Sequence, residues 1–250
     1  MGCGMADLQT LELVLFAMGT FAAALVTGVA GFAFGIVAAA VWLHFLPPAQ
    51  TTALIVAYGL IVQGLSVWKL RRSIRLARLL PFVVGAAIGV PIGVELLHWT
   101  APATLRISVG VVLVLFSLYS LMRPQLAPVS AGNVTDGAVG VLNGVIGGST
   151  GLAGIVVTIW CTLRGWPRDE QRATFQPVGV GVFLMTGLWL GGTGMVGADT
   201  LQLFVIGLPL LVAGTWVGLQ LYARLDEAGF RKVVLGLLLI SGLGLVVRGS

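Results

Sequence analysis

Long apolar runs alternate with short polar breaks along nearly the whole chain. Six of the runs approach or exceed about 20 residues, the length that a helix needs to cross a hydrocarbon core of about 30 Å. They cover residues 51–68, 79–97, 104–122, 172–190, 200–222 and 230–247. We expect each of them to form a membrane-spanning helix.

Four other apolar pieces are shorter and come in two pairs. The pieces are 11–27 with 31–46, and 136–147 with 150–163. Glycines join the members of each pair, Gly28 to Gly31 in the first and Gly147, Gly148 and Gly151 in the second. Because a glycine inside a helix costs about 1 kcal/mol relative to alanine, these clusters predict breaks at which the chain turns inside the membrane.

The two halves of the chain resemble each other. "GFAFGIVAAAVWLHFLP" (31–47) matches "GLAGIVVTIWCTLRGWP" (151–167), and "GAAIGVPIGVELLHWTAPATLR" (85–106) matches "LLVAGTWVGLQLYARLDEAGFR" (210–231). Two matches in the same order predict a duplicated architecture. The expected organisation is an N-terminal tail (1–10), a first membrane repeat (11–122), a linker (123–135) and a second membrane repeat (136–247).

Charge gives the expected orientation. Five basic residues crowd the loop 69–78, which the excess of Lys and Arg on cytoplasmic loops places in the cytoplasm. If each half makes three full crossings and one glycine-joined pair that turns back, twelve of the fourteen Lys and Arg fall on this side, and only Arg106 and Arg248 lie outside. An odd number of crossings makes the two repeats inverted, with both termini in the periplasm.

A rival arrangement treats each short pair as one continuous broken helix. The halves would then be parallel, and the basic loops of the second half would move outside. The charge balance disfavours it. The predicted fold is therefore an all-α polytopic membrane protein with two inverted repeats, each with a glycine-broken pair of short helices and three spanning helices.

Composition agrees with this class and excludes others. Hydrophobic residues make up 58% of the chain and charged residues 9%, whereas soluble domains carry about 25% charged residues. The net charge of +5 lies in short loops without interleaved aromatics, so we expect no nucleic-acid partner. Neither a metal-ligand spacing nor a grouping of Ser, His and acid at membrane depth is present. We therefore expect no enzyme, no cofactor and no metal.

The glycine breaks are the candidate substrate site. A helix that begins inside the membrane has unpaired N–H groups and a dipole that favour an anion, and irregular backbone is tolerated there only where it is buried or lines a cavity. The alternative is that the glycines only turn the backbone. The candidates at the two breaks are Thr27, Gly28, Gly31, Gly147, Gly148, Ser149, Thr150 and Gly151.

Polar side chains inside apolar runs add further candidates. Gln63, Asn143 and Gln176 are expected either to contact the substrate or to tie helices together. Arg172 opens a helix at the predicted inner mouth, where it attracts anions or only follows the charge bias. Glu95 lies near a helix end and is interpreted as a surface acid, with a proton-coupling role as the alternative.

Small residues at a spacing of four give another expectation. Gly89, Gly93, Gly214 and Gly218 are interpreted as sites of close helix packing rather than of ligand contact.

The glycine-rich opening of each half resembles the TauE/SafE family. The resemblance is carried by "GVAGFAFGIV" (28–37) and "GGSTGLAGIV" (147–156), by Pro47 and Pro167, and by "QRAT" (171–174). It implies export of small sulfur-containing anions, such as sulfite or sulfoacetate, across the bacterial inner membrane. We expect alternating access around the two breaks. A carrier or channel for another small anion, and an intramembrane hydrolase, remain alternatives, and a homodimer is left open.

Overall fold

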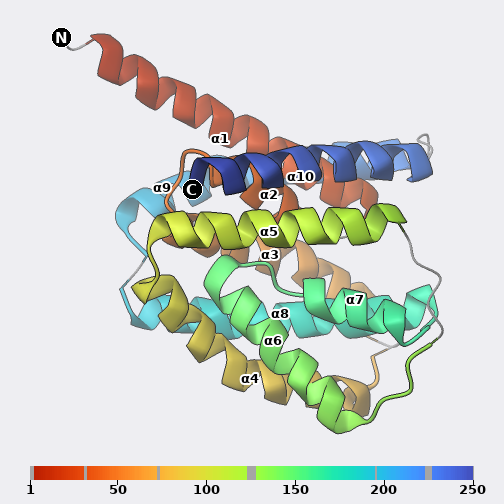
Figure 1. Cartoon of the computed structure of the whole chain (residues 1–250). Helices are drawn as coiled ribbons and strands as arrows, with labels where there is room; N and C mark the ends of the chain where they lie inside the picture. The colour runs from red at the N-terminus through yellow and green to blue at the C-terminus, as the bar shows by residue number, and fades with distance from the viewer. Residues whose placement is uncertain are drawn as a thin grey trace. The chain divides into compact units, whose positions relative to one another are not determined.

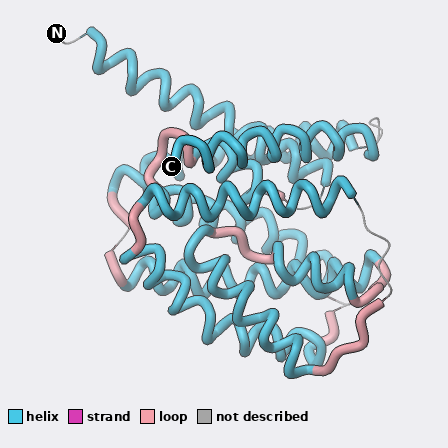
Figure 2. The backbone as a smooth tube through the Cα atoms, in the orientation of Figure 1, coloured by secondary structure: helices cyan, strands magenta, loops and turns pink. Residues whose placement is uncertain are grey.

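The computed structural model describes residues 3–30, 33–71, 74–122, 128–194, 196–222 and 227–249. Within these ranges the chain is built from helices and has no strand (Figure 1; Figure 2). The helices are α1 (Cys3–Ala30), α2 (Phe34–Trp42), α3 (Pro48–Leu70), α4 (Leu76–Trp99), α5 (Pro102–Met122), α6 (Asn133–Thr150), α7 (Ile155–Leu163), α8 (Arg168–Gly192), α9 (Ala198–Tyr222) and α10 (Glu227–Gly249). The predicted all-α class is confirmed.

Six of the described helices are long and apolar enough to cross a membrane. Their apolar stretches are Leu11–Val29, Pro48–Trp68, Leu76–Trp99, Pro102–Met122, Asp169–Gly192 and Ala198–Leu221. Large apolar side chains also point outward from them, as Leu80, Val84 and Ile88 do along α4. Such a surface is stable only against lipid. The chain is therefore a multi-pass membrane protein.

The first pair differs from the expectation at its first member. The sequence predicted a short piece over 11–27, but α1 has 28 residues, or about 42 Å at 1.5 Å per residue. The helix begins at Cys3, within the segment predicted as a tail, and continues to Ala30. Its first two turns, in which Asp7, Gln9 and Thr10 interrupt the apolar pattern, were not counted in the apolar run. In the second pair α6 begins at Asn133, inside the predicted linker.

The second member of each pair is a helix of nine residues that runs back along the first. A Cβ on Gly19 of α1 would lie 3.0 Å from Nε1 of Trp42, at the far end of α2. In the second pair, Asn143 contacts Gly154 at the start of α7, whereas Asp136 contacts Trp160 near its end. Each pair is thus a helical hairpin, and the rival interpretation as one continuous broken helix is wrong.

The described contacts divide the chain into two compact units. One unit contains Met1–Thr51, Pro102–Met122 and Gly197–Ser250, and the other contains Thr52–Ala101 and Arg123–Val196. Each unit therefore combines the hairpin of one half of the sequence with a long helix from the other half. The hairpin α1–α2 shares the first unit with α9, and the hairpin α6–α7 shares the second unit with α4.

Glycine-mediated contacts hold the hairpins to these long helices. In the second unit Gly148 of α6 faces Gly93 of α4, and a Cβ on Gly148 would lie 3.2 Å from the Cα of Gly93. In the first unit Gly28 of α1 faces Gly218 of α9, with a corresponding distance of 2.9 Å. Gly28 and Gly148 differ by 120 positions, and Gly93 and Gly218 by 125, which are the two offsets of the sequence repeat. Equivalent residues therefore make equivalent contacts, as a duplication requires.

Close packing through small residues is confirmed at the four predicted positions. A Cβ on Gly89, Gly93, Gly214 or Gly218 would collide with backbone atoms of the facing helix. Without a Cβ, the two helix backbones approach closely enough to gain dispersion energy over their whole length of contact.

Candidate functional site

The break in the second hairpin lies between Thr150 and Ile155 (Figure 2). Gly151 ends α6 in the left-handed conformation, with φ at 74°, and its N–H donates to the carbonyl of Gly147 at 2.8 Å. Gly154, with φ at 101°, precedes α7. Two glycines with positive φ thus reverse the chain within four residues.

This geometry shifts the break relative to the expectation. The sequence predicted a break over residues 147–151, but residues 147–150 form the last turn of α6 and Gly151 is its cap. Gly147 packs on Val182, and Gly148 packs on the backbone of Val90. A glycine cluster marks where a helix is interrupted, not which side of the interruption carries the free amides.

The hydroxyls of this turn are used within their own helix. Ser149 donates to the carbonyl of Val145 at 2.8 Å, and Thr150 donates to that of Ile146 at 2.6 Å. The Thr150 oxygen also accepts from the N–H of Leu152 at 3.2 Å. They satisfy the backbone of the turn, so substrate contact by Ser149 and Thr150 requires a rearrangement of these bonds.

The first turn of α7 carries the free amides instead. Its first internal hydrogen bond runs from Thr158 to Gly154 at 2.8 Å, so the N–H groups of Ile155 to Val157 precede it. The N–H of Gly154 donates to Oδ1 of Asn143 at 2.9 Å. Asn143 is fully buried, and its Nδ2 has no hydrogen-bond partner among the described residues. A buried, unsatisfied donor therefore lies beside the positive end of a helix.

Two other predicted polar residues lie around the same turn. Oε1 of Gln63 on α3 lies 2.6 Å from the position that a Cβ on Gly179 of α8 would take. The carbonyl oxygen of Ala153 lies 3.8 Å from the same position. On α8 the carbonyl of Phe175 lies 3.8 Å from the Cβ position of Gly154, and the following residue, Gln176, is buried. The structure therefore brings Gln63 and Asn143 to one break from two different helices, and it buries Gln176 on α8, one residue after Phe175.

The two helices of this hairpin differ in length. With nine residues, α7 is about 14 Å long, which is half of a hydrocarbon core of about 30 Å. With 18 residues, α6 is about 27 Å long, so only α7 is limited to half of such a core.

Among its described residues, the first hairpin offers fewer polar groups at its turn. Thr27 is buried and donates to its own helix, to the carbonyl of Ala23 at 2.7 Å. Gly28 packs on α9, and Gly31 lies outside the described residues. The turn enters α2 through Ala33, whose φ of 87° is unusual for a residue with a Cβ. The two turns are thus built differently, and the predicted facing of one against the other stays a prediction.

A polar clasp that the sequence analysis missed closes the base of the second hairpin. Asp136 of α6 is buried, accepts a hydrogen bond from Nε1 of Trp160 at 2.7 Å, and lies 3.8 Å from Nη1 of Arg164. Arg164 also donates to the carbonyl of Ala131. The signal in the sequence is an acid inside an apolar segment, since such an acid needs a partner, but the partner lies 28 residues away.

A second cluster lies at the same end of this unit. Arg78 of α4 pairs with Glu170 of α8 at 2.6 Å. Its guanidinium carbon lies 4.7 Å from the ring centroid of Trp166, and that of Arg164 lies 5.4 Å from the same ring. Arg172, one of the predicted residues, is exposed on α8. Its attraction of anions stays a prediction.

Glu95 lies near the other end of α4. It is exposed and accepts a hydrogen bond from Nε1 of Trp99 at 2.9 Å. This environment fits the interpretation as a surface acid.

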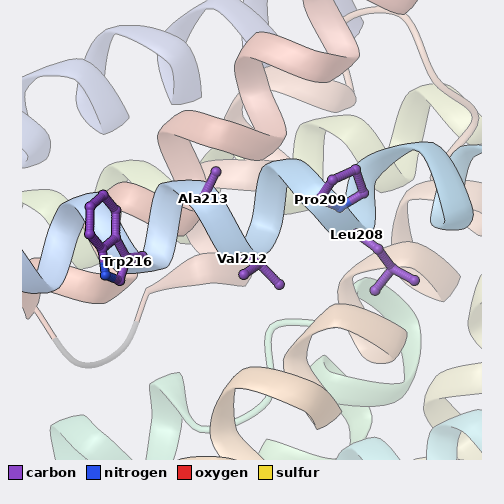
Figure 3. A pocket seen from close by; sticks show the side chains of 5 residues that line it. All are labelled: Leu208, Pro209, Val212, Ala213 and Trp216. Atoms are coloured by element: carbon purple, nitrogen blue, oxygen red, sulfur yellow. The ribbon is translucent and has the colours of Figure 1, made fainter.

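A shallow apolar hollow on α9 does not suit an anion. It is lined by Leu208, Pro209, Val212, Ala213 and Trp216 (Figure 3). Its lining is almost entirely hydrocarbon, which cannot replace the hydration shell of a charged solute. The candidate site is therefore the break between α6 and α7.

The chain was compared with families, curated proteins and solved structures. No curated protein and no solved structure matched it. The family model described as "Sulfite exporter TauE/SafE" matches residues 15–245, a range that includes both hairpins and the polar clusters described above. With its helical hairpins, its apolar spans and this match over nearly the whole chain, the protein belongs to the sulfite exporter TauE/SafE family of membrane transporters.

Proposed function

We propose that this protein exports small sulfur-containing anions, such as sulfite or sulfoacetate, from the cytoplasm across the bacterial inner membrane. The observation that carries the proposal is the break between α6 and α7. There the buried Nδ2 of Asn143, without a partner among the described residues, lies beside the free N–H groups of a helix beginning. Sulfite and sulfonates present oxygen atoms that accept such hydrogen bonds.

The proposed mechanism is alternating access of two inverted repeats. The hairpin contacts Gly28–Gly218 and Gly93–Gly148 join equivalent positions of the two halves, which supports duplication. Inverted repeats with helices interrupted near the bilayer midplane are typical of secondary transporters. The excess of Lys and Arg around 69–78 and 164–172 supports a cytoplasmic location for the base of the second hairpin and periplasmic termini.

The driving force need not come from a coupling ion. A membrane potential that is negative inside favours the exit of an anion by about 2.3 kcal/mol per charge for each 100 mV. The protein would then act as a uniporter for its substrate.

Thermal unfolding of the purified protein tests the site. Sulfite and sulfoacetate should raise the unfolding temperature in a concentration-dependent way, because ligands that bind only the folded state stabilise it. Taurine, which carries an amine, and carboxylate analogues should have smaller effects.

Asn143→Asp is the critical variant. It keeps an oxygen for the N–H of Gly154 but replaces the Nδ2 donor by a negative charge, so the protein should fold and lose its response to sulfite. Thr20→Val is the matched control, because among the described residues this buried hydroxyl bonds only its own helix, at Phe16. An Asn143→Asp protein with a wild-type sulfite response would remove the site, and a wild type indifferent to all sulfur oxyanions would remove the substrate class.

A further inference from the structure

The two ion pairs at the base of the second hairpin have different environments. The pair between Arg164 and Asp136 is mostly buried, with side-chain exposures of 16% and 9%. Asp136 is also held by Trp160. In contrast, Arg78 and Glu170 are exposed by 33% and 37%. The first pair is therefore part of the fold, whereas the second can open into water at little cost.

Arg78 has the properties of an anion-binding residue. Its guanidinium lies over the ring of Trp166, which fixes its plane, and binds the Glu170 carboxylate through one nitrogen at 2.6 Å. A guanidinium has five N–H donors, so further donors stay available to a second set of oxygens. Arg164 lies over the same ring, but Asp136 balances its charge. Arg75, whose charge acts on Glu170, adds a positive charge that attracts anions from solution.

We propose that Arg78 forms a binding site for the incoming oxyanion, in which the carboxylate of Glu170 occupies the site until a sulfite or sulfonate group replaces it. We call Arg78, Trp166 and Glu170 the mouth site. The inference rests on the proposed function, because the incoming ion is the exported anion. A carboxylate and a sulfonate both offer oxygens to a guanidinium, so Glu170 is a built-in competitor.

The position of the mouth site suits this role. Trp166 and Glu170 flank the start of α8, next to the end of α7, whereas the break with Asn143 lies at the other end of α7. The nine residues of α7 separate them by about 14 Å. An anion that leaves the cytoplasm meets Arg78 first and the amides of α7 second.

Competition between the Glu170 carboxylate and the anion predicts by how much the dissociation constant of the mouth site changes when Glu170 is replaced. Exposed ion pairs are closed with an equilibrium constant between roughly 1 and 5. Removing the competing carboxylate should therefore lower the apparent dissociation constant of the mouth site by about two- to sixfold. A structural role for the pair makes the opposite prediction, since loss of either partner would then weaken the site.

The test uses full-length protein labelled with 5-fluorotryptophan and titrated with methanesulfonate. The ¹⁹F resonance of Trp166 is identified by its absence in Trp166→Phe. In the wild type this resonance should shift in a saturable way. Glu170→Gln should lower the dissociation constant two- to sixfold, Arg78→Gln should abolish the shift, and Arg78→Lys should give an intermediate affinity.

Asp169→Asn is the matched control. It removes the same charge one residue away, and Asp169 is exposed and has no ion pair among the described residues. It should change the dissociation constant by less than twofold. Equal effects of Glu170→Gln and Asp169→Asn would overturn the proposal in favour of a general charge effect.

The outcomes separate this inference from the proposed function. If the Trp166 resonance does not respond in any variant while sulfite still stabilises the protein through Asn143, the mouth site is wrong and the transport proposal stands. If the resonance responds as expected while sulfite has no effect that depends on Asn143, the mouth site stands and the site at the break is wrong. If neither readout responds, both are wrong.

Discussion

The contact between Gly148 and α4 gives the most direct prediction. A Cβ added at Gly148 would lie 2.6 Å from the carbonyl oxygen of Val90 and 3.2 Å from the Cα of Gly93, both of which are backbone atoms. Ordinary Cβ contacts begin near 3.4 Å, so Gly148→Ala requires α4 and α6 to separate by about 0.8 Å. A gap of 0.5–1 Å forfeits a quarter to a half of the dispersion energy between facing atoms.

The separation of the two helices determines the expected loss of stability. Overpacking of this kind costs about 1–3 kcal/mol, which corresponds to a fall in unfolding temperature of roughly 2–12 °C for a chain of this size. Gly28→Ala should behave in the same way, because its Cβ would lie 2.6 Å from the carbonyl oxygen of Thr215. Thermal unfolding in detergent, followed by the amount of protein that remains monodisperse, measures both.

The control is a helical glycine without a close neighbour. A Cβ on Gly181 of α8 would have no atom within 4 Å, so Gly181→Ala should raise stability by up to about 1 kcal/mol through helix propensity. A Gly148→Ala protein that melts with the wild type, or that is stabilised like Gly181→Ala, would show that the two helices do not meet as described.

Three further predictions use other parts of the chain. Ala33→Gly should raise the free energy of unfolding by about 0.5–1 kcal/mol. The change removes a left-handed penalty of about 1–2 kcal/mol in the folded state, and the greater conformational freedom of glycine in the unfolded chain cancels part of this gain. An unchanged or lower melting temperature would contradict the φ of 87°. Asp136→Leu should lower the free energy of unfolding by about 1–3 kcal/mol, because Trp160 and the mostly buried Arg164 lose their acceptor. Asp136→Asn should lower it by less. Equal melting temperatures of both variants and the wild type would refute the clasp. In proteoliposomes, efflux of a monovalent sulfonate should accelerate when the interior is made 100 mV negative, since the potential contributes about 2.3 kcal/mol per charge; flux independent of the potential would argue for neutral coupling to another ion.

The candidate site could be predicted in part. Asn143, Gln63 and Gln176 stand out in the sequence because polar groups in apolar runs need a partner or a function. The structure places Asn143 and Gln63 at one break and buries Gln176 on α8. The sequence could not separate residues that turn the chain from residues that face a ligand. Gly148 and Gly28 serve the packing of α6 and α1 on their partner helices.

The two ion pairs at the base of the second hairpin could not be predicted from the sequence. Asp136 and Arg164 are 28 positions apart, and Arg78 and Glu170 are 92 apart. Arg78 and Arg164 each look like loop charges that follow the positive-inside bias, and neither acid indicates in the sequence which arginine it meets. Only the antiparallel return of α7 along α6 and the approach of α8 to α4 bring them together.

By itself the sequence determined what depends on local composition and period. Run length and apolarity specified the helices and the membrane, because a bilayer accepts only segments that satisfy their own backbone. The repeated glycines specified where helices break and where they pack closely. The tertiary structure decided which helices meet: each hairpin packs on the fourth helix of the opposite half. The sequence does not show which glycine-lined helix face packs on which other face. The partner is selected by the shapes of the two faces, because helices in lipid associate through close packing rather than through exclusion from water.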